Sequence, residues 1–326
     1  MTQTLVTGGS GFVGQHLVAA LLARGRSVRV LDRRAPACAQ AGAHYVKGSI
    51  LDAKLVADVL DDVDEVYHLA ALPGMWMPRK DDFHDVNCRG TEIVIEAARA
   101  RGVTRFLHCS TESILFGSSN AEPIVTESVR ATPEDMPGAY TRSKMMAERR
   151  AMEAAAAGYP VRIANPTMPI GPHNGNLTPP TLMLQYFNSR KIQIYLDFVF
   201  NLVDVRDVAD GMLLVMERGE PGQRYILGGE DISLGRLLDM LGGISGRKAL
   251  RVKVPKAFAY TTAAVMEFMA DYVLRQPPSA TTEGVLIASR AKPLSIEKSR
   301  RELGYAPRPI EQALREALAS LAYDAR

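Results

Sequence analysis

The sequence predicts an α/β protein with a doubly wound parallel sheet and a smaller, mostly helical C-terminal domain. Three observations support this fold class. Short β-rich runs alternate with helical patterns through the first half of the chain, which is the order that βαβ units produce. A glycine-rich segment separates the first run from the helix that follows it. After residue 168 the alternation breaks at a proline-rich segment, and from residue 229 on the pattern is mostly helical.

The first half supplies most of the predicted sheet. The predicted strands are rich in β-branched and apolar residues and cover 4–7, 27–31, 44–47, 65–69, 105–109 and 160–164. The predicted helices between them cover 15–24, 55–60, 90–100 and 143–157. Strands that alternate with helices form a parallel sheet covered on both faces, which is a doubly wound arrangement.

The second half is less regular. Five prolines between residues 166 and 180 predict an irregular excursion from the sheet. The alternation then resumes with a strand at 200–205, a helix at 207–217 and a strand at 224–227. Four more helices are predicted, at 234–241, 257–274, 296–303 and 310–322. We therefore expect a first domain of residues 1–168 and 201–228, and a second domain of residues 169–200 and 229–326.

Composition and charge exclude several classes of partner. The 39 Lys and Arg residues exceed the 36 Asp and Glu residues by only three, which predicts no nucleic-acid-binding surface. Glu267 and Asp271 interrupt the apolar stretch 260–274, so we expect an amphipathic helix there and no membrane contact. The three cysteines and the histidines lack disulfide-framework or metal-ligand spacing. The start of the chain lacks a signal-peptide pattern, so we expect a cytoplasmic protein.

The glycine-rich segment 7–14 predicts a dinucleotide site. Gly8 permits a tight turn, Gly11 permits close approach of the backbone to a pyrophosphate, and Gly14 permits close packing of helix on strand. The helix N-terminus that follows favours negative charge. An ordinary strand-to-helix turn is the alternative, but the position of the loop favours a Rossmann-type sheet. The predicted contacts in this loop are Gly8, Ser10, Gly11, Phe12, Val13 and Gly14.

The end of the second predicted strand bears on the choice of cofactor. Asp32 lies eighteen residues after Gly14, where a carboxylate can accept hydrogen bonds from the adenosine ribose and repel a 2′-phosphate. That favours NAD. Arg33 and Arg34 follow directly and can pair with such a phosphate, so NADP stays open as the alternative.

Tyr140 and Lys144 form the candidate acid/base pair. They are four residues apart at the start of a predicted helix and therefore share one face. A phenol has a pKa of about 10, and a neighbouring ammonium together with an oxidised nicotinamide favours its ionised form. A hydroxyl from Ser110, Thr111 or Ser113 at the end of a parallel strand can orient a substrate oxygen. A hydroxyl-capped turn is the structural alternative.

Together these motifs resemble the extended short-chain dehydrogenase/reductase superfamily, also called the NAD-dependent epimerase/dehydratase superfamily. Segments 48–52, 68–71 and 87–91 are similar to its adenine-contacting segment, its fourth-strand segment and the helix start that follows. Segments 165–172 and 224–230 look most like the dihydroflavonol-4-reductase-like branch. Segment 302–309 is particularly similar to hopanoid-associated sugar epimerases. The resemblance runs the full length of the chain.

The resemblance assigns roles to individual residues. It implies that Thr111 is the catalytic hydroxyl, that Tyr140 is the acid/base and that Lys144 anchors the nicotinamide ribose. It also implies a homodimer through the helices near 90–100 and 140–157. The further cofactor contacts that it implies are Asp32, Arg33, Ser49, Ile50, Leu69, Ala70, Ala71, Cys109, Pro166 and Thr167.

Departures from the family pattern bear on reaction and substrate. Glu112 stands where sugar dehydratases carry an acid, but Ser113 replaces their second acid, so dehydration is not expected. Phe200 stands where nucleotide-sugar members typically carry a pyrophosphate-binding arginine, which favours an apolar substrate. We expect segments 74–78 and 168–200 to act as lids. Four side chains of one late helix are expected to close the pocket: Met266, Phe268, Met269 and Tyr272.

Three functions follow from these features. The leading hypothesis is an NAD(P)-dependent oxidoreductase that interconverts a secondary alcohol and a ketone of a small apolar molecule. An epimerase that works by transient oxidation with tightly bound NAD is the alternative. A non-catalytic cofactor sensor or scaffold is a third possibility, and the presence of both Tyr140 and Lys144 argues against it.

Overall fold

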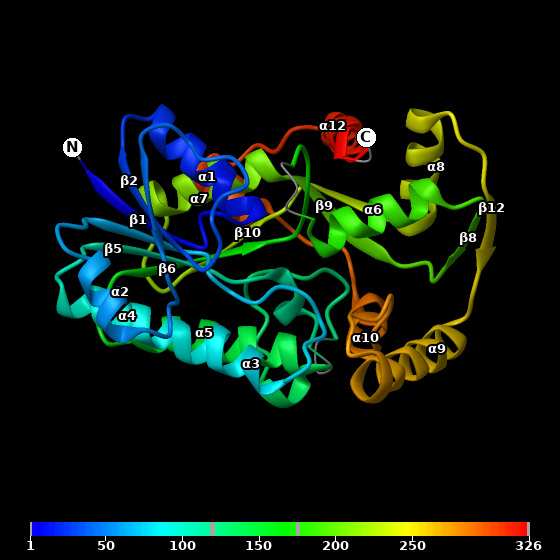
Figure 1. Cartoon of the computed structure of the whole chain (residues 1–326), viewed down its shortest axis with the longest axis horizontal. Coiled ribbons are helices and arrows are strands. Elements are labelled where there is room, and N and C mark those ends of the chain that lie inside the picture. Colours follow the sequence, from blue (N-terminus) through cyan, green and yellow to red (C-terminus); the bar gives the residue numbers. More distant parts are fainter. Residues whose placement is uncertain (1, 118–120, 174–176, 325–326) are drawn as a thin grey trace.

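A computed structural model describes residues 2–117, 121–173 and 177–324 of the chain (Figure 1). Its main sheet has seven parallel strands in the order β10-β6-β5-β4-β1-β2-β3. The strands are β1 (Gln3–Thr7), β2 (Ser27–Asp32), β3 (Ala43–Lys47), β4 (Glu65–His68), β5 (Arg105–Cys109), β6 (Val161–Pro166) and β10 (Arg224–Leu227). The order reverses between β1 and β4, and ligands of such sheets bind at this point. The predicted Rossmann-type fold is confirmed.

Helices cover both faces of the sheet because its strands are apolar on both sides. On one face, Val6 and Val30 pack against α1 (Phe12–Ala23) and α7 (Val205–Arg218). On the other face, Leu5 and Leu31 pack against α2 (Ala53–Val59), α4 (Gly90–Ala100) and α5 (Ala139–Ala156). Figure 1 shows α1 and α7 on one side of the strands and α2, α4 and α5 on the other.

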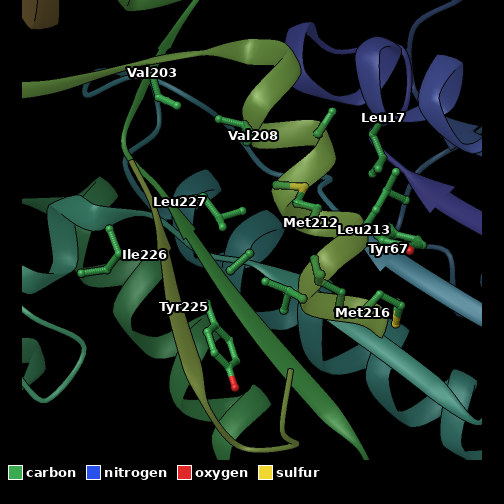
Figure 2. Close-up of a cluster of buried hydrophobic side chains, with 14 of the residues drawn as sticks. Leu17, Tyr67, Val203, Val208, Met212, Leu213, Met216, Tyr225, Ile226 and Leu227 are labelled. Atoms are coloured by element: carbon green, nitrogen blue, oxygen red, sulfur yellow. The ribbon is translucent and has the colours of Figure 1, made fainter. Parts of the chain in front are cut away.

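Helix α7 supplies much of the core on its face of the sheet. Val208, Met212 and Met216 are buried among Leu17 of α1 and Tyr67 of β4, as Figure 2 shows. Full burial of an aliphatic side chain of this size contributes about 1.5–3 kcal/mol. Because α7 follows a strand of the second sheet, this packing fixes the position of that sheet relative to the first.

A second group of elements, all after residue 167, contains two smaller sheets. A three-stranded sheet has the order β11-β9-β7, and a two-stranded parallel sheet pairs β12 with β8. Its strands are β7 (Met168–Ile170), β8 (Ile192–Tyr195), β9 (Val199–Asp204), β11 (Glu230–Ser233) and β12 (Leu250–Lys253). Its helices are α6 (Pro179–Ser189), α8 (Leu234–Ser245), α9 (Lys256–Met269), α10 (Thr282–Arg290) and α12 (Ile310–Asp324). The helix α11 (Glu297–Leu303) instead packs against β10 and α7 of the main sheet.

Short helical segments complete the chain. They are α3 (Asp81–Phe83), the π-helical turns η1 (His84–Arg89) and η4 (Ala270–Leu274), and the 3-10 turns η2 (Glu112–Leu115) and η3 (Pro133–Asp135). None of the helices in the described part of the chain combines the length and apolar character that crossing a membrane requires.

The structure corrects the prediction of an irregular segment after residue 168. This segment contains β7, α6 and β8. Pro179 and Pro180 occupy the first positions of α6, where a missing N–H costs no hydrogen bond, and Thr178 caps the helix by accepting from Thr181 N. The prolines therefore start a helix instead of breaking one. The predicted helix 257–274 continues through η4, and α10 was not predicted.

Close packing of β1 on α1 depends on two glycines. Gly8 has a φ of +75°, and a Cβ there would lie 2.7 Å from Ala70 N. A Cβ on Gly14 would collide with Gly8 O. The predicted roles of Gly8 in the turn and of Gly14 in helix–strand packing thus agree with the geometry.

Gly14→Ala is expected to lower the free energy of unfolding by about 1–3 kcal/mol, since the added methyl group has no room without backbone movement. Gly243→Ala is a matched control in α8, because a Cβ there meets no heavy atom within 4 Å. It should stabilise the protein by about 0.5–1 kcal/mol through helix propensity. Urea denaturation measures both values, and equal shifts in the two variants would contradict the packing argument.

Candidate active site

The predicted site residues gather at the carboxyl edge of the seven-stranded sheet. The glycine loop follows β1, Asp32 ends β2, Leu69 follows β4, and Thr111 lies just beyond β5. Tyr140 and Lys144 lie in the first turns of α5, which packs against the same edge. Segments that are as far apart in sequence as Gly8 and Lys144 therefore meet where parallel sheets bind ligands.

The N-terminal end of α1 fits a pyrophosphate. Gly11 is the residue that precedes the helix, and no side chain caps its first-turn N–H groups. Such groups favour an anion. Asp32 fixes the loop in front of them, because its carboxylate accepts hydrogen bonds from Ser10 N and Arg34 N, each at 3.1 Å. Arg33 and Arg34 are exposed.

The other predicted cofactor contacts lie along the same edge. Ser49 Oγ accepts from Leu51 N at 3.2 Å, and Ile50 is buried against Gly90. Leu69, Ala70 and Ala71 are half-buried, and Ala70 N donates to Thr7 Oγ1 at 3.3 Å. Pro166 ends β6, and Thr167 Oγ1 donates to Asn201 Oδ1 at 3.0 Å.

A buried hydrogen-bond network beneath this edge was not predicted. Thr91 Oγ1 donates to Asn87 O at 2.6 Å, so its lone pair accepts from His68 Nε2 at 2.9 Å. His68 Nδ1 then accepts from Thr7 Oγ1 at 2.7 Å. Burial, aided by the charge of Lys144, lowers the pKa of His68 to about 3. The imidazole is therefore neutral, and this chain of bonds assigns its tautomer.

Asn87 extends the network to the candidate catalytic helix. Its Oδ1 accepts from Leu72 N at 2.7 Å, and its Nδ2 donates to Ser143 Oγ at 2.9 Å. Ser143 Oγ in turn donates to Tyr140 O at 2.7 Å. One amide side chain thus connects the segment after β4 with the first turn of α5.

Lys144 is held by the main chain of β5. It is buried, and its Nζ donates to Cys109 O at 2.8 Å. Burial lowers its pKa from the ordinary value. Burial also raises the pKa of the Cys109 thiol to about 11, so Cys109 is a neutral thiol at physiological pH.

The phenol of Tyr140 is neutral in the protein alone. Burial and then the nearby Glu112 carboxylate raise the pKa of Tyr140 well above its usual value, and the Lys144 ammonium donates to Cys109 O. The sequence prediction of an ionised phenol also requires an oxidised nicotinamide, so it stays a prediction. The ring of Tyr140 packs edge-on against Phe83, with centroids 5.9 Å apart.

Thr111 forms the hydroxyl-capped turn that the sequence offered as the structural alternative. It caps η2 by accepting from Ser113 N at 3.2 Å. Its hydroxyl donates to Glu112 Oε2 at 3.0 Å and is also hydrogen-bonded to Ser113 Oγ at 3.0 Å. Its carbonyl accepts from Asn165 Nδ2 at 3.2 Å. The hydroxyl is thus both structural and adjacent to an acid.

Glu112 is the acid in this cluster. Burial raises its pKa to about 7, and the hydrogen bond from Thr111 opposes that shift only partly. A carboxyl group with such a pKa exchanges its proton near neutral pH. The sequence identified Glu112 only as a departure from the family pattern. Its raised pKa follows from burial in the folded protein, which no local motif predicts.

Glu283 is a second residue that sequence analysis missed. It lies on α10, is almost fully buried, and accepts hydrogen bonds from Thr141 Oγ1 at 2.7 Å, Thr141 N at 2.8 Å and Tyr140 N at 3.3 Å. It therefore caps the N-terminus of α5 from the C-terminal region. Gly138 precedes that helix, and a Cβ there would collide with the Glu283 carboxylate. The absence of a local capping side chain at Gly138 was the available signal.

Some of the residues predicted to face the substrate are buried, and others are exposed. Phe200 is buried in the second core, with its ring centroid 5.1 Å from that of Phe198. Trp76 of the predicted lid is also buried, and its Nε1 donates to Asp271 at 2.7 Å. The prediction that the helix at 257–274 closes the substrate pocket stays a prediction. Its four side chains are 37–71% exposed, namely Met266, Phe268, Met269 and Tyr272.

No group of three or more His, Cys, Asp or Glu side chains within the described ranges could hold a metal ion.

Comparison with known proteins identifies the relatives of this arrangement. Residues 4–228 match the NAD dependent epimerase/dehydratase family. The chain is 34% identical over 320 residues to a putative dihydroflavonol 4-reductase of Synechocystis, covering 96% of this chain and 92% of that protein. It is 29% identical over 322 residues to the sterol demethylase protein B of Methylococcus capsulatus, covering 97% of each. The crystal structure of gox2253 is 32% identical and superposes with a TM-score of 0.85, covering 100% of this chain and 99% of that one.

Glu112 makes a testable contribution to pH dependence. Its pKa is about 7 in the folded protein and about 4.5 in the unfolded chain, so the folded state binds more protons between these values. Stability therefore falls as the pH rises through this window. Glu112→Gln removes that loss and should gain about 2–3 kcal/mol relative to the parent protein between pH 4.5 and 7.

Denaturant titrations across this pH range measure the difference between the two proteins. Glu153→Gln is the control. Slight burial acts to raise the pKa of Glu153, but hydrogen bonds from Arg150 and Arg149 lower it. The titration of Glu153 therefore changes the stability only below the range of pH 4.5 to 7. A Glu112→Gln difference that stays constant from pH 4.5 to 7 would refute the assignment.

Proposed function

Because this chain belongs to the NAD dependent epimerase/dehydratase family, we propose that Tyr140, Lys144 and Thr111 are its catalytic residues in NAD(P)-dependent oxidoreduction. The reaction interconverts a secondary alcohol and a ketone. The observation that carries this proposal is the meeting of all three side chains with the glycine loop at one sheet edge. The uncapped α1 N-terminus and Asp32 support dinucleotide binding there. NAD, when bound, supplies the nicotinamide that accepts or donates hydride.

The chain's own residues handle the proton and the substrate oxygen. Tyr140 exchanges the proton of the substrate hydroxyl through its phenol oxygen. Lys144 binds the ribose from its fixed position on Cys109 O. Thr111 orients the substrate oxygen, and its hydroxyl is held in place by the hydrogen bond that it donates to Glu112. Glu283 and Asn87 are positioning residues, because they hold the first turn of α5.

An apolar substrate is favoured over a nucleotide sugar. Phe200 supplies no charge where a diphosphate would need one, and its burial in the second core leaves it no access to such a group. Two relatives carry names that refer to a dihydroflavonol and a sterol, both of which are flat and largely apolar. We expect a cyclic, largely apolar ketone or alcohol.

The organisation of the chain follows the same proposal. Residues 1–168 and 201–228 bind the cofactor, and residues 169–200 and 229–326 bind the substrate. We propose a homodimer through α4 and α5, which lie side by side on one face of the sheet. We expect the protein to work in the cytoplasm.

Tyr140→Phe is expected to lower turnover by about 10²–10⁴-fold while the NAD dissociation constant stays within about twofold, because only the proton-transferring oxygen is lost. Ketone-dependent oxidation of NADH over a panel of apolar cyclic ketones measures turnover, and fluorescence titration measures binding. Tyr159→Phe, just before the amino end of β6 and thus at the opposite edge of the sheet, is the matched control and should leave both unchanged. Undiminished activity in Tyr140→Phe would rule out the mechanism.

Asp32 is expected to make NADH bind at least about tenfold more tightly than NADPH, since its carboxylate repels a 2′-phosphate. Asp32→Asn should lower the ratio of the NADPH to the NADH dissociation constant, and Arg33→Gln should raise it. Calorimetric titrations measure both constants. A preference for NADPH in the parent protein would mean that Arg33 and Arg34 dominate. Bound NAD that copurifies and does not exchange would instead favour the alternative proposal, an epimerase that works by transient oxidation.

A further inference from the structure

Helix α9 and the turn η4 present an apolar face to the outside. Their buried residues are only Ala263 and Ala270. Side chains at helical spacing cover the opposite side with exposures of 37–71%: Phe258, Val265, Phe268, Met269, Tyr272 and Val273. We call these six residues the α9 face. Single exposed apolar residues are common, but a contiguous face of this kind marks an interaction site.

Polar groups on this helix are turned inward or satisfied locally. The exposed Thr261 donates its hydroxyl to Ala257 O at 2.9 Å, and Thr262 donates to Phe258 O at 2.9 Å. Glu267 accepts from Thr282 N at 2.8 Å and from Thr282 Oγ1 at 2.5 Å. Asp271 accepts from Trp76 and Lys80. The α9 face can therefore leave water without stranding a hydrogen-bonding group.

Unpaired positive charge stands at both ends of the face. Residues 246–275 contain six Lys and Arg against two Glu and Asp, but Arg251 and Lys253 pair with Asp239 and Asp197 outside this segment. Both acids of this segment point inward, as described above. Lys248, Lys256 and Arg275 are exposed and form no ion pair with the described residues. Lys256 and Arg275 lie at the two ends of α9 and η4.

From these observations we propose that the α9 face binds the surface of an anionic phospholipid bilayer. An exposed apolar helix face flanked by basic residues is the pattern of helices that lie in the headgroup region, and each basic residue near an anionic leaflet adds attraction. A second copy of the chain is disfavoured as the partner, because self-association would bring together two faces whose flanking unpaired charges, Lys256 and Arg275, are all positive. This proposal departs from the sequence expectation of no membrane contact, which followed from the two acids that interrupt the apolar stretch 260–274. Both acids point inward, and a helix that lies on the surface does not need to span the membrane.

The position of the face connects it with the candidate active site. Glu267 on α9 holds Thr282 at the start of α10, and the next residue, Glu283, caps the catalytic helix α5. Figure 1 shows α9 and α10 together at the end of the molecule that also holds β8 and β12. This placement would let an apolar substrate pass from the bilayer to the candidate active site. That role rests on the proposed function, whereas membrane binding itself does not.

Sedimentation of the full chain with vesicles tests the proposal. We expect binding to vesicles of phosphatidylglycerol and phosphatidylcholine, much weaker binding to pure phosphatidylcholine, and loss of binding between about 0.1 M and about 1 M salt. The double variant Phe268→Ser, Tyr272→Ser should lower the partition coefficient at least about tenfold. Lys256→Gln combined with Arg275→Gln should lower it by a similar factor.

The double variant Ile124→Ser, Leu182→Ser is the matched control, because it removes two side chains of similar exposure, 52% and 46%, elsewhere on the surface. It should bind vesicles like the parent protein. The α9 variants should keep the parent's melting temperature and NAD affinity, since none of these residues lies in the candidate active site. Vesicle binding without any ketone turnover would refute the proposed function and leave the membrane contact standing.

Two results would overturn the proposal. The first is equal vesicle binding by the parent and the Phe268→Ser, Tyr272→Ser variant, or no binding to anionic vesicles by either. The second is a dimer in sedimentation equilibrium that this variant dissociates and that does not bind vesicles, which would make the α9 face a contact between two copies of the chain.

Discussion

The candidate active site depends on one buried chain of hydrogen bonds through the neutral imidazole of His68. It starts at Thr7 on β1, passes through His68 and Thr91, and reaches the carbonyl of Asn87. The Asn87 amide then joins the segment after β4 to Ser143 on α5. A charged imidazole would have two donors and could not accept from Thr7. Burial, which keeps His68 neutral, is thus a condition for holding the glycine loop and the catalytic helix in register.

The same edge of the sheet contains groups whose charged forms are disfavoured. Burial raises the pKa values of Glu112, Cys109 and Tyr140 and lowers that of Lys144. Such a collection of neutralised groups is costly for stability and is typical of sites that move protons. The charge of a bound dinucleotide is therefore an integral part of the electrostatics of this edge, and the protein alone does not provide a low phenol pKa.

Local sequence signals predicted the parts of the site that lie within one turn or one helix. Gly8 and Gly14 are required by a single β1–α1 turn, and Tyr140 and Lys144 share a face because of helical spacing, so both could be predicted. The His68 network and the Glu283 cap join segments far apart in sequence, and no local pattern specifies such pairings. The orientation of α9 escaped prediction for a related reason. Its apolar residues form a helical face, but periodicity does not tell whether a face points to the core or to the outside.

Glu283 shows that the catalytic helix is not a self-contained module. The cap of α5 comes from a residue 142 positions later in the chain, well beyond the end of the segment 4–228 that matches the family. During synthesis, the first turn of α5 is complete only once the chain has been extended past α10. A chimera that exchanges the C-terminal region must therefore bring an equivalent carboxylate against Gly138. The first turn of α5 and the region that contains α10 are thus inherited together.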